Sequence, residues 1–516
     1  MITYDVSPEE YRHWALTVQP PVARLILGGD ESGGDDGCPD AEDAEAQLAS
    51  LLRVDIELAD AVRRLRFEYP DVSAVVMTGA ASDAFSTLIA EVSPGAAPDV
   101  AVNVWMFRNE LRCAIEDASA NSGQYWLAAL NGPAGGPGYE LALAADEIVL
   151  VDDGRSAVAL PDASTPGGFG PTSCLTRLVD KRGVRPDLID VFCCCRAGVS
   201  GDRAVDWGLV DLVAPEELFT EVVSERAGAA AGTSRRGLAE EAVLLGPLWR
   251  EEFDDGFAYP NVRVELDRDR GVADLTVVGP ANNECFAPEP GPKRLRSRWW
   301  PLAACRELDD ALLVLRGHRP EIRTVVLRTE GDPLAVASAD VAMTSGYEHD
   351  WFVREVVLYW RRILRHIDAA WQSVIALIEP GSCFVGTLLD LALAADRICM
   401  VDGTTADDPD GRPAELFLTS MNFGLLPRAD GLTRLESRFI SRRDHVAALA
   451  QRVGDPIGAA EALKLSLVTE AVPPNEWGAL GRRVIEERVR LTDACRAGLA
   501  LALSGAGERE ILRRQP

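Results

Sequence analysis

Several features that would indicate a nucleic-acid, membrane or secreted protein are missing from this sequence. Basic residues are few: 52 Lys and Arg stand against 81 Asp and Glu in 516 residues, a formal net charge of -29. Such a surface repels phosphates and anionic lipid headgroups. No run approaches the roughly 18 apolar residues of a membrane span, and no basic segment followed by an apolar core opens the chain. We therefore expect a cytoplasmic protein with neither a nucleic-acid partner nor a membrane.

Patterned cysteines and histidines are also missing. The 11 cysteines include Cys193-Cys194-Cys195 but no paired CxxC motifs, and the 5 histidines show no nucleophile or ligand spacing. The acidic, glycine-rich stretch 28–45 has no fixed ligand spacing either, so a solvated surface loop is favoured over a metal site. The sequence predicts reduced thiols, no metal and no cofactor.

An internal repeat is present and organises the chain. WLAALN at 126–131 leads to YELALAADEIVLVD at 139–152, and SVIALI at 373–378 leads to LLDLALAADRICMVD at 388–402. Three further pairs keep the same order: 11–29 with 262–279, 71–80 with 321–332, and 175–182 with 432–439. Two copies of one unit predict two related domains, which also suits the length of the chain.

Each copy alternates strand-like runs with longer helical patterns, which is typical of an α/β layer fold. Residues 54–69 place their apolar side chains near helical spacing and predict an amphipathic helix before a buried strand. The small-residue stretch 225–241 reads as the end of a helix and a linker. We expect a first domain over 1–230, a linker over 231–257 and a second domain over 258–516.

The richest stretch for chemistry is the run from Asn131 to Glu140, Asn-Gly-Pro-Ala-Gly-Gly-Pro-Gly-Tyr-Glu. It reads as a strand end, a glycine-rich turn and a helix start. Glycines let the backbone crowd a ligand, and the first N–H groups of a helix point outward, so such a turn can hold a developing negative charge. Pro137 has no N–H, so this turn has lost one donor.

These motifs resemble those of the benzoyl-CoA dihydrodiol lyases, also called 2,3-epoxybenzoyl-CoA dihydrolases, of the crotonase (enoyl-CoA hydratase) superfamily. The resemblance rests on the frame 131–148, on VDIEL at 54–58 and on VDKR at 179–182. In the second copy it rests on WFVRE at 351–355, IEPGSCFVGT at 378–387 and NFGL at 422–425. It implies two tandem crotonase-like (ClpP/crotonase) α/β domains of repeated ββα units, and a homo-oligomer.

The resemblance also implies a site in the first domain. Glu140 matches the family's first carboxylate, and Asp162 stands where the family has a second glutamate, one methylene longer. Two neighbouring carboxylates can divide acid and base roles in proton transfer and water activation. Read without the family, Glu140 also suits the positive end of a helix dipole, and Asp162 suits a turn or an N-cap.

The family's oxyanion hole has two backbone N–H donors. One belongs to the middle glycine of a triplet, and Pro137 occupies that place between Gly136 and Gly138. The other matches the segment 85–91, with Ile89 the closest counterpart. Tyr139 lines the same turn. Loss of one such donor costs roughly 100- to 1,000-fold in turnover in other enzymes. Read as structure alone, Pro133 and Pro137 would simply stiffen the loop.

The second copy has Asp390 where the first has Glu140. Its turn, 380–386, has larger side chains where the turn of the first copy has glycines. We expect it to play a supporting role.

Three functions remain open from the sequence. The first is a lyase or hydrolase acting on an aromatic-derived acyl-CoA, in which coenzyme A is a part of the substrate. The second is a crotonase-fold enzyme repurposed for a small molecule that is not a thioester, which Pro137 favours. The third is a non-catalytic scaffold subunit, which the two carboxylate positions argue against.

Overall fold

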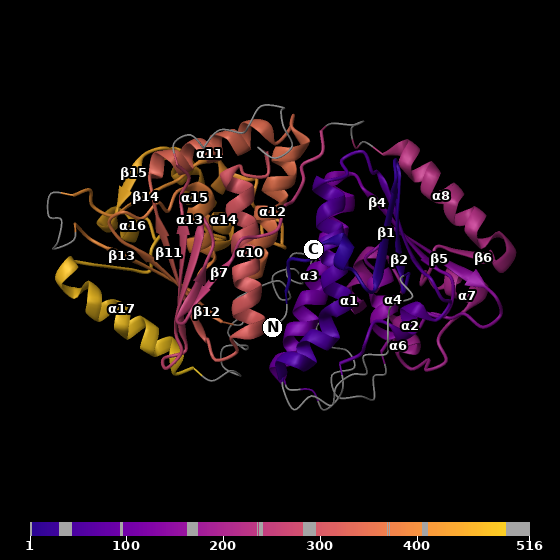
Figure 1. The fold of residues 1–516 in the computed structure, drawn as a ribbon. Helices are drawn as coiled ribbons and strands as arrows, with labels where there is room; N and C mark the ends of the chain where they lie inside the picture. The colour runs from indigo at the N-terminus through magenta and orange to yellow at the C-terminus, as the bar shows by residue number, and fades with distance from the viewer. Residues whose placement is uncertain are drawn as a thin grey trace. The chain divides into compact units, whose positions relative to one another are not determined.

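The computed structural model describes residues 3–29, 44–92, 96, 98–161, 174–234, 236, 241–281, 296–368, 370, 372–404 and 411–491. The chain divides into two compact units, Met1–Pro247 and Leu248–Pro516 (Figure 1). Each unit is a mixed α/β structure built on its own sheet. Asp162, the segment 162–173 around it and most of the acidic stretch 28–45 lie outside the described residues.

The sheet of the first unit runs in chain order from β1 to β6. Its strands are β1 (Trp14–Gln19), β2 (Val22–Leu27), β3 (Ala74–Gly79), β4 (Tyr125–Leu130), β5 (Glu147–Asp152) and β6 (Leu212–Pro215). β1 and β2 form an antiparallel hairpin, and the remaining neighbours are parallel. Parallel strands need a crossover between them, and helices fill those connections.

Helices cover both faces of this sheet. The long helices α1 and α3 pack together on one side, and α8 packs on the other against β2, β3, β4 and β6 (Figure 1). The helices are η1 (Pro8–Glu10), α1 (Ala44–Phe67), α2 (Ala84–Thr87), α3 (Pro98–Ser122), α4 (Gly136–Ala142), α5 (Cys174–Thr176), η2 (Arg177–Lys181), α6 (Pro186–Cys193), α7 (Gly201–Asp206), η3 (Glu216–Leu218) and α8 (Phe219–Thr233). The predicted amphipathic helix at 54–69 is thus the second half of α1.

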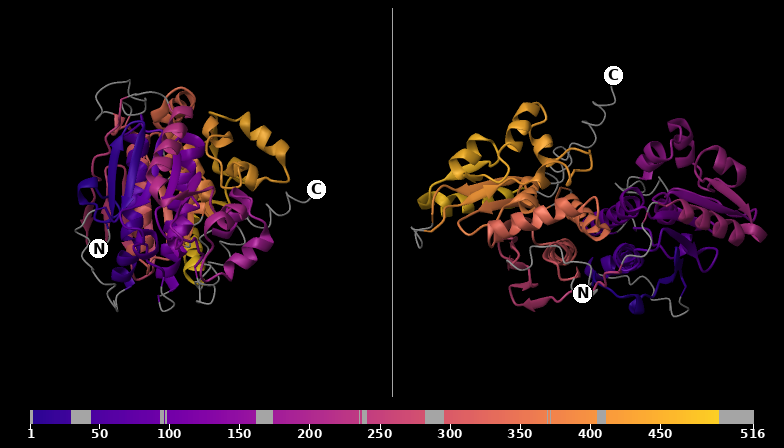
Figure 2. Two further views of the ribbon diagram at one scale, coloured as in Figure 1. Left: turned by 90° about the vertical axis from the view of Figure 1, so that its right-hand side faces the viewer. Right: turned by 90° about the horizontal axis from the view of Figure 1, so that it is seen from above.

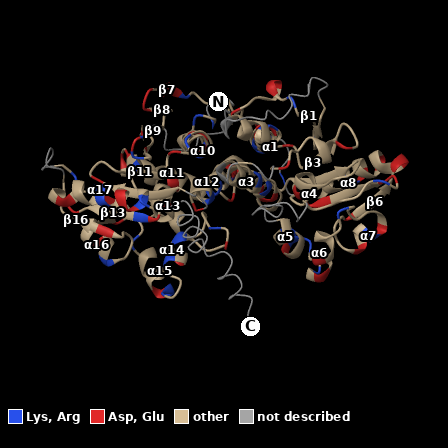
Figure 3. Cartoon of the chain, turned by 90° about the horizontal axis from the view of Figure 1, so that it is seen from below, with Lys and Arg blue, Asp and Glu red and all other residues tan. Residues whose placement is uncertain are grey.

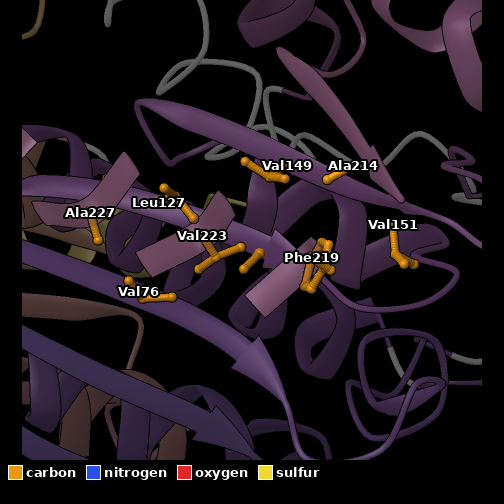
Figure 4. Close-up of a cluster of buried hydrophobic side chains, with 9 residues drawn as sticks. Val76, Leu127, Val149, Val151, Ala214, Phe219, Val223 and Ala227 are labelled. Atoms are coloured by element: carbon orange, nitrogen blue, oxygen red, sulfur yellow. The ribbon is translucent and has the colours of Figure 1, made fainter. Parts of the chain in front are cut away.

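The core between α8 and the sheet explains the apolar character of the central strands. A strand covered on both faces reads as a continuous hydrophobic run, as β4 and β5 do. Figure 4 shows the side chains that meet under α8: Val76, Leu127, Val149, Val151, Ala214, Phe219, Val223 and Ala227.

The second unit repeats this plan with an extended sheet, in the order β16-β13-β12-β11-β10-β9-β8-β7. Its strands are β7 (Glu251–Phe253), β8 (Gly256–Ala258), β9 (Val262–Asp267), β10 (Val272–Val278), β11 (Thr324–Glu330), β12 (Ser373–Ile378), β13 (Arg397–Val401) and β16 (Glu470–Val472), beside a small pair β14 (Glu415–Phe417) and β15 (Pro456–Gly458). β7 and most of β8 lie within 231–257, the segment that the sequence assigned to a linker.

The helices of the second unit also cover both faces of its sheet. They are α10 (Trp300–His318), α11 (Pro333–Gly346), α12 (Trp351–Asp368), α13 (Gly386–Ala394), η4 (Ser420–Phe423), α14 (Arg434–Arg438), α15 (Arg443–Ala450), α16 (Ala459–Lys464) and α17 (Pro474–Val489). α10 and α12 pack together on one side, and α17 packs on the other (Figures 1 and 2).

The repeat extends to single hydrogen bonds. Gln124 precedes β4, and its Nε2 donates to the carbonyls of Leu65 and Val72; Gln372 precedes β12 and makes the same pair of bonds to Leu315 and Ile322. The Tyr11 hydroxyl donates to Asp60 at 2.6 Å, and the Tyr259 hydroxyl donates to Asp310 at 2.6 Å. These shared bonds fix the register in which the two copies correspond.

Charged side chains of both signs are spread over the two units (Figure 3). In the part of the chain that is described, no helix combines the length and apolarity that crossing a membrane requires. Within the same residues, no three His, Cys, Asp or Glu side chains gather where they could hold a metal ion.

Candidate active site

The glycine-rich turn connects β4 to α4, and two of its glycines are required by their surroundings. Gly136, the first residue of α4, has φ +50, a region that L side chains rarely adopt. A Cβ added to Gly138 would lie 1.9 Å from the carbonyl oxygen of Phe85 in α2. The turn therefore packs directly against the segment 85–91.

The backbone donors of this turn are all engaged. The Ala134 N–H donates to the Ala157 carbonyl at 3.0 Å, and the Gly136 N–H donates to the Ala159 carbonyl at 3.1 Å. The Gly135 N–H donates to Oγ of Ser86 at 3.3 Å, and the Gly138 N–H donates to the Gly135 carbonyl at 3.1 Å. Pro137 has none to donate. The neighbouring Gly138 amide therefore does not replace the missing donor, and in this structure the turn from 134 to 138 offers no N–H to a ligand.

On the facing segment, Ile89 is buried, and its N–H makes no hydrogen bond to any of the described residues. Arg108 from α3 holds the next residue, because its Nη2 donates to the Ala90 carbonyl at 2.8 Å. Arg108 is itself anchored by Asp55 at 3.0 Å. Ile89 thus lies directly before a residue whose carbonyl α3 holds in place.

Glu140 lies in α4 and is 3% exposed. Its Oε2 accepts a hydrogen bond from Nη2 of Arg112 at 2.9 Å, and Arg112 comes from α3 with 2% of its surface exposed. Burial lowers the pKa of Arg112, and the opposite charge of Glu140 opposes that shift. A buried carboxylate is tolerated as an anion only when it is paired, and Arg112 supplies the pair.

Sequence reasoning missed Arg108 and Arg112. Their signal is a pair of arginines four residues apart on a helix, so that both point to the same side. Flanked by Val104, Leu111 and Ile115, they interrupt the apolar face of α3 that packs inward. Charged side chains on a buried helix face need partners of opposite charge inside the fold. Asp55 is the partner of Arg108, and Glu140 is the partner of Arg112.

Tyr139 turns away from this site. Its hydroxyl donates to the carbonyl of Leu209 at 2.8 Å, its side chain is fully buried, and burial raises its pKa. It packs edge-on against Phe192. Tyr139 therefore anchors α4 to the loop before β6, and its hydroxyl is already used.

In the second unit, the corresponding turn is closed by its own side chains. Thr387, the counterpart of Pro137, donates its N–H to Oδ2 of Asp340 at 3.0 Å and its hydroxyl to Oδ1 at 2.6 Å. The Asp340 carboxylate thus accepts the hydrogen bonds that this turn could otherwise donate to a bound anion. Burial raises the pKa of Asp340 to about 6.

Asp390, the counterpart of Glu140, has no arginine at the position of Arg112, and the positive charge that reaches it comes from Arg434. Trp360 lies 248 positions after Arg112 (360 − 112), the same interval that separates Gln124 from Gln372 (372 − 124). The indole of Trp360 donates to the Pro301 carbonyl. Oδ1 of Asp390 is buried without a hydrogen bond among the described residues, and burial raises its pKa to about 7.

Comparison with known proteins gives an extensive match. No family model matches the chain. It is 41% identical over 502 residues to the benzoyl-CoA-dihydrodiol lyase of Aromatoleum evansii, covering 97% of this chain and 88% of that protein. Two similar solved structures are enoyl-CoA hydratases. The one from Geobacillus kaustophilus HTA426 is 22% identical, with the match covering 43% of this chain and 75% of that chain at a TM-score of 0.31. The one from Bacillus anthracis is 23% identical, with the match covering 43% of this chain and 77% of that chain at a TM-score of 0.32.

Proposed function

We propose that this chain, an enzyme that belongs to the family of benzoyl-CoA-dihydrodiol lyases, cleaves an aromatic-derived acyl-CoA of the dihydrodiol type in its first unit. The observation that carries the proposal is the buried pair of Glu140 and Arg112 beside the glycine-rich turn. In this proposal the protein acts as a homo-oligomer in the cytoplasm and needs no bound cofactor or metal.

Glu140 is the proton-transfer group of the proposed reaction. Held by Arg112 on a packed helix, its carboxylate has a fixed position and can accept a proton from substrate or water, then return it to the departing group. Asp162 is proposed as the second carboxylate on the resemblance alone, since it lies outside the described residues. Ile89 is proposed as a backbone donor to the carbonyl oxygen, since its N–H makes no hydrogen bond to any of the described residues.

A second candidate is a crotonase-fold enzyme whose small-molecule substrate is not a thioester. One observation favours it: every N–H between 134 and 138 is bonded within the protein. Polarisation of a thioester carbonyl would then rest on donors outside this turn, such as the Ile89 amide.

Two measurements on the purified full chain separate the candidates. The first is thermal unfolding with increasing benzoyl-CoA or free coenzyme A, because a ligand that binds the native state raises the melting temperature in a saturable way. The second is turnover of benzoyl-CoA dihydrodiol. Saturable stabilisation together with turnover supports the acyl-CoA lyase, whereas no shift at millimolar ligand and no turnover would reject it in favour of the second candidate.

A further inference from the structure

Arg108 is a buried arginine of α3 that bonds to three places in the first unit, with 3% of its surface exposed. Its Nε donates to Oδ2 of Asp55 at 3.0 Å, and its Nη2 donates to the carbonyls of Leu51 at 3.2 Å and Ala90 at 2.8 Å. Asp55 and Leu51 belong to α1, whereas Ala90 belongs to the connection that follows α2. The guanidinium therefore ties this connection to the two packed helices α1 and α3.

The backbone that Arg108 holds has few other polar contacts. Residues 89–91 belong to no helix or strand. Among the described residues, the N–H groups of 89–91 form no backbone hydrogen bond, and the bond from Arg108 to Ala90 is the one that reaches a carbonyl of this segment. An irregular segment with few such bonds changes conformation easily. The bond to Ala90 therefore limits the positions that Ile89, the proposed donor, can take.

The second unit has no ion pair at the corresponding place. The tyrosine–aspartate bonds of the two units set the interval between α1 and α10 at 250 (310 − 60), and the glutamine bonds set the interval between the ends of α3 and α12 at 248 (372 − 124). Asp55 then has Cys305 as its counterpart (305 − 55), and Arg108 has Val356 (356 − 108). Both counterparts are fully buried. An apolar pair thus stands in the second unit where the first has an ion pair.

The bond to Leu51 does not explain why the first unit keeps an arginine. The counterpart of Leu51 is Pro301 (301 − 51), and its carbonyl accepts a hydrogen bond from the indole of Trp360 at 3.0 Å. The bond to Ala90 is different, because the connection after β11 in the second unit is α11, a helix of 14 residues. A helix holds its own backbone with internal hydrogen bonds. Only the irregular connection of the first unit needs a donor from outside.

The energetics of buried ion pairs argue that this pair is not kept for stability. Taking two charges out of water is costly, and apolar residues of similar volume in place of a buried pair often leave a protein equally stable or more stable. The second unit has such residues, Cys305 and Val356, at the same place. The ion pair of Asp55 and Arg108 is therefore explained by what it holds, the segment 89–91.

We propose that Arg108, oriented by Asp55, is a positioning residue of the reaction, which holds the segment 89–91 so that the Ile89 N–H stays placed for the carbonyl oxygen of the thioester. The inference rests on the proposed function and concerns the carbonyl that every acyl-CoA has. A donor that is already in place stabilises developing negative charge without reorganising during the reaction. Misplacement of such a group by about 1 Å can cost about 100-fold in rate. Loosening the segment should therefore lower kcat more than it raises KM.

The test gives the first unit the residues of the second. The variant D55C/R108V copies the pair of Cys305 and Val356 and removes both charges together, so that neither is left buried alone. For wild type and this variant, one measures thermal unfolding, and kcat and KM for the thioesters in the family's two names, the dihydrodiol and the 2,3-epoxide of benzoyl-CoA. We expect a folded variant with kcat lower by about tenfold or more and KM within about threefold.

A second readout reports on the carbonyl itself. The infrared band of benzoyl-CoA, labelled with a heavy carbon isotope at the thioester carbonyl, moves to lower frequency when the oxygen accepts a hydrogen bond. The band should be lower in the wild-type complex than in water, and it should move back toward the value in water in the complex with D55C/R108V. A loss of stability alone does not move this band.

The matched control is another ion pair between the same two helices. Nη2 of Arg66 in α1 lies 3.0 Å from Oδ2 of Asp117 in α3, nine positions after Arg108 (117 − 108). The variant R66M/D117L also removes two charges between α1 and α3, but neither side chain bonds to the segment 89–91. It should keep the wild-type kcat and the wild-type carbonyl band.

The outcomes separate the inference from the proposed function. Wild-type turnover together with an unchanged kcat and band in folded D55C/R108V would overturn the inference alone. If that variant does not fold, R108K decides: lysine keeps a charge beside Asp55, but its single nitrogen cannot replace the two that reach Asp55 and Ala90. We expect kcat to fall in R108K, and a wild-type kcat would overturn the inference. Neither turnover nor benzoyl-CoA binding by wild type would reject the proposed function and the inference with it.

Discussion

Arg112 and Trp360 occupy the same place in the two copies of the fold. The neighbouring carboxylates, Glu140 and Asp390, differ in whether they have a charged partner at that place. Arg112 forms a buried ion pair with Glu140 at 2.9 Å, whereas Asp390 keeps one buried oxygen without a hydrogen bond among the described residues. The first unit has thus paired the carboxylate that we propose as the proton-transfer group. The second has replaced the arginine with an aromatic side chain that packs on Trp300.

The ion pair predicts a large loss of stability when one partner is removed. Arg112→Met leaves the buried Glu140 without its arginine partner, and we expect the free energy of unfolding to fall by about 3–5 kcal/mol. Denaturation in urea measures it. The double variant R112M/E140Q should recover much of that loss, because neither charge remains; a double variant as unstable as R112M would contradict the pairing.

The close approach of α2 and α4 predicts a strong difference between two glycine positions of the turn, 135 and 138. Gly138→Ala brings a methyl group against the Phe85 carbonyl, whose backbone cannot move away freely, and we expect a loss of about 2 kcal/mol or more. Gly135→Ala is the matched control, since nothing lies within 4 Å of its added Cβ and its φ is −115. Equal melting temperatures for the two variants would refute the packing described here.

The buried acids of the second unit predict a stability that depends on pH. Their pKa values are raised, to about 7 for Asp390 and about 6 for Asp340, so the folded state holds protons that the unfolded chain releases above its ordinary value of 3.8. Their contribution is present at low pH and is lost as pH rises through the folded pKa values.

The Asp390→Asn variant isolates this effect. The charged groups that face Asp390 are Arg434, Asp340 and Asp368, and they remain in the variant. Relative to wild type, D390N should gain stability as pH rises from about 4 to 7, by at most about 1.4 kcal/mol per pH unit. Unfolding free energies at several pH values measure this. The exposed control D254N should follow wild type, and a D390N curve parallel to wild type would refute the raised pKa.

Much of the architecture could be predicted from the sequence because its signals are local. The strands β4 and β12 are apolar runs that end at turn residues, and the two copies keep their motifs in the same order. Strands β7 and β8 escaped prediction because three-residue strands have too little periodicity to distinguish them from a linker.

The site was predictable only in part, for a physical reason. Glu140 and Pro137 were predicted from their place in a motif. The partners of those residues lie on other elements: Arg112 is 28 positions away from Glu140 in the chain, and Glu91 approaches Gly136 from the connection after β3. Contacts of that kind depend on how helices pack, which a single sequence does not specify.

We propose that the chemistry resides on Glu140 of the first unit and not on its counterpart Asp390. The most direct test is kcat for benzoyl-CoA dihydrodiol in E140Q and D390N, each checked for folding by circular dichroism, with R112M/E140Q as the charge-balanced companion. We predict a fall of about 100-fold or more in E140Q and in the companion, the scale of a lost proton-transfer group, and a D390N value within about twofold of wild type. Wild-type turnover by folded E140Q, or its loss in D390N alone, would contradict the claim.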